Sequence, residues 1–125
     1  QLMADMNKRV MVIAQIETAL AVENVMEIAA VEGVDMLLIG PNDLSVSLGI
    51  PGDLMNPIEL DAITKVAKAA RENKKLFTIH SNAQLHNHFQ DELRVVMQIG
   101  DTDMLKSGCE GIKAYCDNLK PLAGI

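Results

Sequence analysis

The chain has 125 residues, of which 49% are hydrophobic, and its formal net charge is −6. That length and composition allow one folded core, whereas the acidic balance argues against a nucleic-acid or anionic-membrane partner, since both need a basic face. Apolar runs all fall short of the roughly 20 residues that a membrane span requires, so we expect no membrane partner.

The first strand is predicted over residues 10–16, where an apolar run ends in polar residues. Side chains alternate along a strand, so Gln15 and Glu17 should point the same way at its carboxyl end. A helix is predicted over 18–31, because apolar residues recur there near a period of 3.6 and Gly33 follows. Residues 1–8 are expected to be the end of a helix or a frayed terminus.

The second strand is predicted over Met36–Ile39, four apolar residues typical of a strand buried on both faces. Gly40 and Pro41 break it, and Asp43 follows just beyond its carboxyl end, where ligands bind in α/β proteins. Alternatively, Asp43 caps a short helix over 44–48. This strand alone leaves both interpretations open.

A second carboxylate changes the balance between them. If the two strands are parallel neighbours, Glu17 and Asp43 meet at one rim of the sheet. Two converging carboxylates suit a hard divalent cation such as Mg²⁺ or Mn²⁺, which takes further ligands from water and substrate.

The rest of the chain continues the alternation of strands and helices. We expect a connection over 40–56, a helix over 57–73, strands over 76–80 and 95–99, a short helix or loop over 82–92, and a closing helix over 103–118 interrupted by Gly108 and Gly111. This order predicts α/β architecture with a parallel sheet, right-handed crossovers and one domain over 1–125. A flavodoxin-like open sheet is less consistent, since no Gly-rich phosphate loop follows the first strand.

Three segments together resemble the HpcH/HpaI aldolases, a family of metal-dependent class II aldolases that act on pyruvate-type enolates. They are Gln15-Ile-Glu-Thr18, Glu32-Gly-Val-Asp35 and Ile39-Gly-Pro-Asn-Asp-Leu-Ser45. The 26-residue interval between Glu17 and Asp43 agrees with the family pattern. The resemblance is strong over residues 10–49 and is only architectural beyond them.

The resemblance implies a (β/α)₈ TIM barrel, which typically needs about 250 residues. We therefore expect this chain to be the C-terminal half of one barrel domain. The resemblance also implies that Glu17 and Asp43 hold Mg²⁺, Mn²⁺ or Co²⁺, and that Gln15 is a catalytic residue that positions the bound ligand.

The same resemblance implies a binding site for the substrate carboxylate in the Gly40-Pro41-Asn42-Asp43 turn. The backbone amides of Asn42 and Asp43 are the expected donors, Pro41 has no N–H, and Gly40 allows close backbone approach.

The implied function is that of a metal-dependent carbon–carbon lyase, an aldolase that forms or uses a pyruvate-type enolate from 2-keto acids of the pyruvate or oxaloacetate type. Related enolate chemistry, such as oxaloacetate decarboxylation or carbon–carbon bond formation, remains an alternative. The family's catalytic His and Arg have no match in this chain. A further alternative is therefore a catalytically incomplete half-barrel that associates with its own copy or its missing half, because open sheet edges favour a homo-oligomer.

Three smaller expectations concern histidine, aspartate and cysteine. His80 should end the third strand at the same rim, as a satisfied histidine or a substrate contact, whereas His86 and His88 lie on an exposed polar stretch without a role. Asp101 or Asp103 should cap the closing helix. The only two cysteines lie seven residues apart near the C-terminus, too far for a bridge along a helix, so we expect buried or partly buried free thiols in a reducing compartment such as the cytoplasm.

Overall fold

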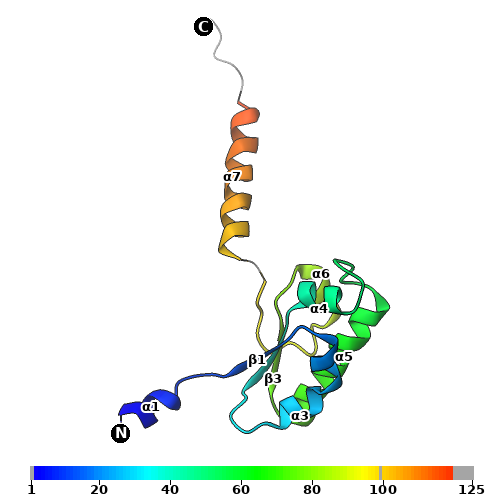
Figure 1. Cartoon of the computed structure of the whole chain (residues 1–125). Helices are drawn as coiled ribbons and strands as arrows, with labels where there is room; N and C mark the ends of the chain where they lie inside the picture. Colours follow the sequence, from blue (N-terminus) through cyan, green and yellow to red (C-terminus); the bar gives the residue numbers. More distant parts are fainter. Residues whose placement is uncertain (1, 99, 120–125) are drawn as a thin grey trace, which may run out of the picture.

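The computed structural model describes residues 2–98 and 100–119. Its elements in chain order are α1 (Leu2–Asn7), β1 (Ile13–Ile16), α2 (Ala19–Glu23), α3 (Val25–Ala30), β2 (Met36–Ile39), α4 (Pro41–Ser47), α5 (Pro57–Glu72), β3 (Leu76–Ile79), α6 (Ala83–His88) and α7 (Asp101–Asp117). Figure 1 shows the sheet with α3 and α5 beside it, and α4 and α6 near one end of the strands.

The sheet has three parallel strands in the order β1-β2-β3. The three strands begin and end level with one another. Ile13, Met36 and Leu76 are neighbours at their starts, and Ile16, Ile39 and Ile79 are neighbours at their ends. The predicted parallel α/β architecture is therefore confirmed, and all three carboxyl ends lie at one rim.

A belt of hydrogen bonds joins the opposite ends of the strands. The Asp35 carboxylate accepts from the Val12 N–H at 2.8 Å. The Asp35 carbonyl accepts from the Leu76 N–H at 3.0 Å. One residue before β2 thus holds the starts of both neighbouring strands.

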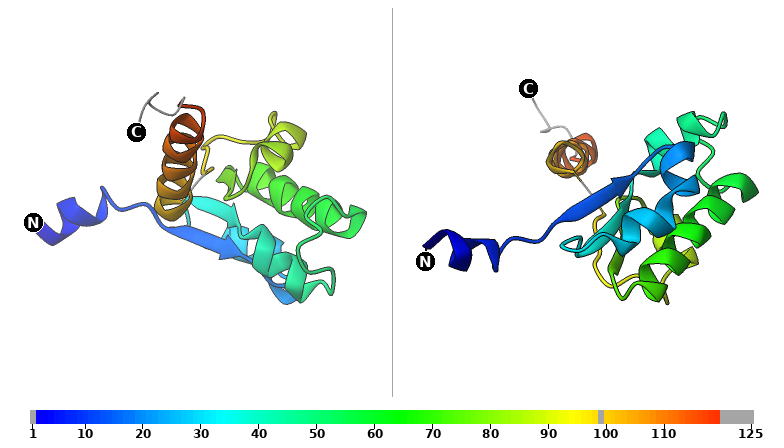
Figure 2. Two further views of the ribbon diagram at one scale, coloured as in Figure 1. Left: turned by 90° about the horizontal axis from the view of Figure 1, so that it is seen from above. Right: turned by 60° about the horizontal axis from the view of Figure 1, so that its bottom comes forward.

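The core lies between the sheet and the helices on one of its faces. Helix α5 packs against β2, β3 and α3, and it presents a buried apolar stripe that includes Ile63 and Val66. The strands contribute Leu37, Ile39 and Phe77 to the same cluster. Figure 2 shows these helices together on one side of the sheet. Because side chains alternate, Gln15, Leu38 and Thr78, which are partners in the register, face the other side.

Two predicted strands are shorter than expected. β1 begins at Ile13 rather than at residue 10, because Val10 and Met11 make no backbone hydrogen bond to β2 within the described residues; Val10 is 63% exposed. The predicted strand 95–99 is reduced to one parallel bridge between His80 and Met97, and Ile99 lies outside the described residues. The Thr78 hydroxyl also ties this segment by donating to the Val95 carbonyl at 2.8 Å.

The predicted helix over 18–31 is two short helices. Asn24 ends α2 and begins α3, and its side chain donates to the Leu20 carbonyl at 2.8 Å. Asparagine competes with the helical hydrogen-bond pattern through such local bonds, so the helix breaks there.

The closing helix differs from its prediction in two respects, its continuity and its cap. α7 runs without interruption through Gly108 and Gly111, and Gly100 is its N-cap, so neither predicted aspartate caps it. The Asp101 carboxylate instead accepts from the Thr102 N–H at 2.8 Å. The helix contributes no buried residue and extends away from the sheet (Figure 1).

The exposure of α7 also settles the state of the cysteines. Cys109 and Cys116 are free, as predicted, but both are exposed, so the prediction of burial is wrong. The reducing compartment stays a prediction. Within residues 2–98 and 100–119, the structure contains no helix that is long and apolar enough to cross a membrane.

Candidate active site at the carboxyl ends of the strands

Gln15 and Glu17 form one polar arm at the end of β1. The Gln15 Nε2 donates to Glu17 Oε2 at 2.6 Å, so the two side chains point the same way as the strand alternation predicts. Gln15 is exposed and Glu17 is half-buried. Because one carboxylate oxygen is engaged by Gln15, the orientation of the Glu17 carboxylate is fixed before any ligand arrives.

Gly40 fits closely against this arm. A Cβ atom at position 40 would lie 2.9 Å from Gln15 Nε2 and 3.0 Å from Glu17 Oε2, which is closer than side-chain atoms normally approach a Cβ. Gly40 thus lies close to the side chains of the neighbouring strand, whereas its close approach to a substrate stays a prediction. A larger residue at this position would push the Glu17 carboxylate out of place.

Helix α4 begins earlier than expected, at Pro41 rather than Leu44. Proline is favoured at the first helical position, since its missing N–H would have no intrahelical partner there. Gly40 is the N-cap and Asp43 lies in the first turn, so Asp43 is not the helix cap that the alternative interpretation required. Within the described part of the chain, the N–H groups of Asn42 and Asp43 have no hydrogen-bond acceptor.

Two hydrogen bonds hold α4 over the end of β1. The Gly40 N–H donates to the Ile16 carbonyl at 3.3 Å. At the other end of the helix, the Ser47 hydroxyl accepts from the Ala19 N–H at 2.9 Å. The carboxylates of Glu17 and Asp43 therefore lie on elements that meet at the same rim.

A buried serine stabilises the turn that follows α4. Ser45 is fully buried, and its hydroxyl donates to the Asn42 carbonyl at 2.7 Å and accepts from the Gly52 N–H at 3.0 Å. Ser45 and Ser47 were not singled out as site residues from the sequence. The sequence feature that could have identified them is their position within four residues of Asp43, on a helix that follows a buried strand.

One of the three histidines, His86, lies differently from the expectation. The His80 N–H donates to the Ile39 carbonyl at 3.1 Å, which places it at the rim, and its side chain is exposed. His86 is buried rather than exposed, and its Nε2 lies 2.8 Å from the Ile79 carbonyl, to which it donates. His86 thereby ties α6 to the end of β3. His88 is exposed, as predicted.

The donors at this rim fit a hard divalent cation. They are carboxylate oxygens, and no group of three or more His, Cys, Asp or Glu side chains gathers anywhere in residues 2–98 and 100–119. A Mg²⁺-type ion commonly binds through one or two carboxylates and keeps water or substrate oxygens at its other positions. Glu17 and Asp43 each carry a carboxylate of the kind that such an ion uses.

Comparison with known proteins shows the family to which this chain belongs. The family model for HpcH/HpaI aldolase/citrate lyase matches residues 3–106. The chain belongs to the HpcH/HpaI aldolase/citrate lyase family. The match includes the Gln15–Glu17 arm and the whole of α4, so the rim described above lies within the family region.

Named relatives and a solved structure support the same assignment. A 4-hydroxy-4-methyl-2-oxoglutarate aldolase of Chaetomium globosum is 40% identical over 95 residues, which cover 74% of this chain and 35% of the relative. A 5-keto-4-deoxy-D-glucarate aldolase of Escherichia fergusonii is 42% identical over 69 residues, which cover 55% of this chain and 27% of that relative. The crystal structure of an HpcH/HpaI aldolase from Desulfitobacterium hafniense superimposes with a TM-score of 0.83 at 27% identity, covering 95% of this chain and 47% of that one.

The chain thus spans about a third of the length of these curated HpcH/HpaI relatives and about half of the solved HpcH/HpaI structure. Its fold is the α/β fold of that TIM-barrel family, of which it contains one part.

Proposed function

We propose that this chain provides the cation- and carboxylate-binding rim of a carbon–carbon lyase, an aldolase that acts on 2-keto acids of the pyruvate or oxaloacetate type. The observation that carries the proposal is the Gln15–Glu17 arm beside the first turn of α4. Membership of the HpcH/HpaI family and the aldolase relatives support the reaction class. In the whole protein, the chain would be the C-terminal half of a single barrel domain.

In this proposal, Glu17 and Asp43 hold a divalent cation, namely Mg²⁺, Mn²⁺ or Co²⁺. The bound ion supplies Lewis-acid polarisation of the keto-acid oxygens. Gln15 fixes the Glu17 carboxylate through its 2.6 Å hydrogen bond and keeps its own amide oxygen at the rim. Gly40 leaves the space that this arm needs.

The substrate carboxylate binds at the start of α4. The N–H groups of Asn42 and Asp43 have no acceptor within the described residues, and they lie at the positive end of the helix dipole. Pro41 contributes rigidity but no donor, because it has no N–H. These backbone donors would orient a 2-keto acid with its carboxylate toward α4.

Metal binding by the present chain tests the proposal. Titration with Mn²⁺, followed by calorimetry, should show binding that Glu17→Gln weakens at least about tenfold, because half of the carboxylate pair becomes neutral. Glu23→Gln is the matched control, since Glu23 is exposed on α2 and should leave the affinity unchanged. Equal Mn²⁺ affinity for wild type and Glu17→Gln would refute the proposed site.

The activity requires the whole protein, because this chain matches only part of its relatives. EDTA should abolish aldol cleavage by the whole protein, and Mg²⁺, Mn²⁺ or Co²⁺ should restore it. The isolated chain should turn over poorly. Decarboxylation of oxaloacetate and carbon–carbon bond formation are related outcomes that the same assay separates by product.

A second candidate function is association through the open parts of the structure. The residues that precede and begin β1 are apolar and exposed, with Val10 at 63% and Met11 at 50%, and α7 has no buried residue. Exposed apolar surface at a sheet edge favours a partner strand or helix. We propose that a second copy or the remaining half of the barrel covers these surfaces.

A further inference from the structure

A basic hollow lies at the ends of the strands opposite the candidate active site. It is bounded by the end of α5, the start of β3 and the segment before the His80–Met97 bridge, and its volume is about 250 Å³. Four of its lining residues are cationic, namely Arg71, Lys74, Lys75 and Arg94, against the single carboxylate of Glu92. In a chain with a net charge of −6 and only 11 Lys and Arg residues, this cluster reverses the sign of the charge locally.

Two of the cations are held in place without being neutralised. The Lys75 Nζ donates to the Val34 carbonyl at 2.7 Å. The Arg94 Nη1 donates to the carbonyls of Asp91 and Leu93 at 2.9 and 3.0 Å. Carbonyl oxygens are dipoles rather than charges, so both side chains keep their full positive charge in a restricted position.

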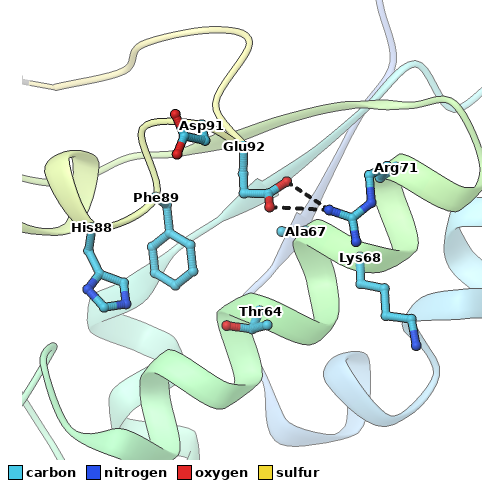
Figure 3. A pocket seen from close by; sticks show the side chains of 8 residues that line it. All are labelled: Thr64, Ala67, Lys68, Arg71, His88, Phe89, Asp91 and Glu92. Carbon is cyan, nitrogen blue, oxygen red and sulfur yellow. Dashed lines mark hydrogen bonds and ion pairs between the residues drawn. The ribbon is translucent and has the colours of Figure 1, made fainter.

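The only ion pair in the hollow is an exchangeable one. Arg71 contacts both carboxylate oxygens of Glu92, at 3.2 and 3.3 Å, and its side chain is 65% exposed (Figure 3). The pair separates the basic hollow from a neighbouring hollow beside His88 and Phe89. Exposed ion pairs contribute little stability, so an anion in the hollow can compete with Glu92 for Arg71.

Lys74 occupies a position whose backbone favours another residue. Its φ is +57°, and the Lys75 N–H donates to the Ala70 carbonyl at 2.8 Å, which is the helix ending that usually has glycine or asparagine at the left-handed residue. Across residues 2–98 and 100–119, the Lys74 side chain makes no ion pair or hydrogen bond. The backbone conformation therefore does not favour lysine at position 74. The charge of the Lys74 side chain borders the hollow.

We propose that the basic hollow binds a small polyanion of the diphosphate class. Four cations and one carboxylate leave an excess of three positive charges. Phosphate oxygens match both the forked donors of arginine and the point charge of lysine. The hollow is built between elements of this chain, at the end of the sheet remote from Glu17 and Asp43, so its ligand is distinct from the keto acid at the rim.

Calorimetric titration of the chain with inorganic pyrophosphate, at constant ionic strength set with NaCl, tests this site. Wild type should show saturable binding. Lys74→Gly should weaken it by roughly three- to tenfold, because one cation is lost, yet raise the melting temperature of the ligand-free chain by a few degrees, because glycine relieves the left-handed conformation. Lys106→Gln removes an exposed cation on α7 and should leave the affinity unchanged.

Glu92→Gln gives a test of opposite sign. Removing the competing carboxylate should tighten pyrophosphate binding by about threefold, an improvement that damage to the fold would not produce. Weaker binding by Glu92→Gln, unchanged binding by Lys74→Gly, or heat that NaCl reproduces at equal ionic strength would each overturn the proposal. ADP serves as the second arm: equal affinity means that the diphosphate alone is recognised, and tighter binding means that a nucleoside carries it.

Discussion

Glu59 lies in the first turn of α5 with its side chain fully buried. Neither of its carboxylate oxygens has a hydrogen-bond partner within the described residues. A glutamate at this position commonly accepts from the N–H of the helix cap, but the Asn56 N–H already donates to the Asp53 carbonyl at 3.0 Å. Desolvation consequently raises the pKa of Glu59 from 4.5 to about 7.

This pKa predicts a specific dependence of stability on pH. The folded chain holds the proton more tightly than the unfolded chain, so the contribution of Glu59 is fully present below pH 4.5 and is lost as the pH rises through about 7. Glu59→Gln mimics the protonated form. Its free energy of unfolding should match wild type near pH 4.5 and exceed it at pH 8 by up to about 3 kcal/mol.

Urea unfolding at several pH values measures this difference. Glu23→Gln, at an exposed position, should show the same pH dependence as wild type. A Glu59→Gln difference that stays constant between pH 4.5 and pH 8 would contradict the assignment.

At the residue scale, the sequence predicted the direction of side chains where strand alternation decides it. The shared direction of Gln15 and Glu17 follows from alternation, and the hydrogen bond between them confirms it. The burial of His86 could not be predicted, because its partner is the Ile79 carbonyl, seven residues earlier, and depends on how α6 turns back over β3. The roles of Glu17 and Asp43 as cation ligands stay predictions.

At the scale of elements, two serines of different burial join α4 to neighbouring segments of the chain. Ser45 is fully buried and bonds Gly52, whereas the exposed Ser47 bonds Ala19. Ser45→Ala leaves a partly buried N–H without an acceptor and should lower the free energy of unfolding by about 1–3 kcal/mol. Ser47→Ala should lower it by about 1 kcal/mol or less, since water can replace the hydroxyl.

Urea unfolding of the two variants provides a matched comparison on one helix. If Ser47→Ala is the more damaging of the two, burial does not determine the stability of this turn. Mn²⁺ titration of Ser47→Ala then reports whether the contact with Ala19 also positions Asp43.

The elements themselves were predicted best where burial is uniform. The strand Met36–Ile39 has the predicted bounds because all four of its residues are buried, and α5 ends one residue before the predicted limit because it carries a regular buried stripe. Predictions failed where a neighbour decides the outcome. β1 is shortened by its edge position, the 18–31 helix is divided at Asn24, and the fourth strand keeps only the bridge of His80 to Met97.

At the scale of the whole molecule, α7 buries none of its residues within the part of the chain that the structure describes. Leu105 and Ile112 lie one heptad apart and are 71% and 66% exposed, and Tyr115 extends the same apolar face at 67%. Ion pairs of Lys106 with Glu110 and of Lys113 with Asp117 join neighbouring turns of the helix at other positions. Such a face is suited to packing against another helix.

We expect the chain to associate in solution, with a mass by size exclusion and light scattering above the 13.6 kDa of one copy. The double variant Leu105→Gln/Ile112→Gln should shift it toward one copy, because each apolar side chain buried at an interface contributes about 1.5–3 kcal/mol. Lys106→Gln/Lys113→Gln is the matched control. A monodisperse wild-type monomer would contradict the association.

The belt through Asp35 has a consequence for how this molecule tolerates change. Because the N–H groups of Val12 and Leu76 both donate to Asp35, the three strands begin level with one another. The strands also end level with one another, at Ile16, Ile39 and Ile79. A substitution in one loop that follows a strand would therefore move only the residues of that loop. A substitution at Asp35 would shift the carboxyl ends of all three strands, although Asp35 lies at the opposite end of the sheet.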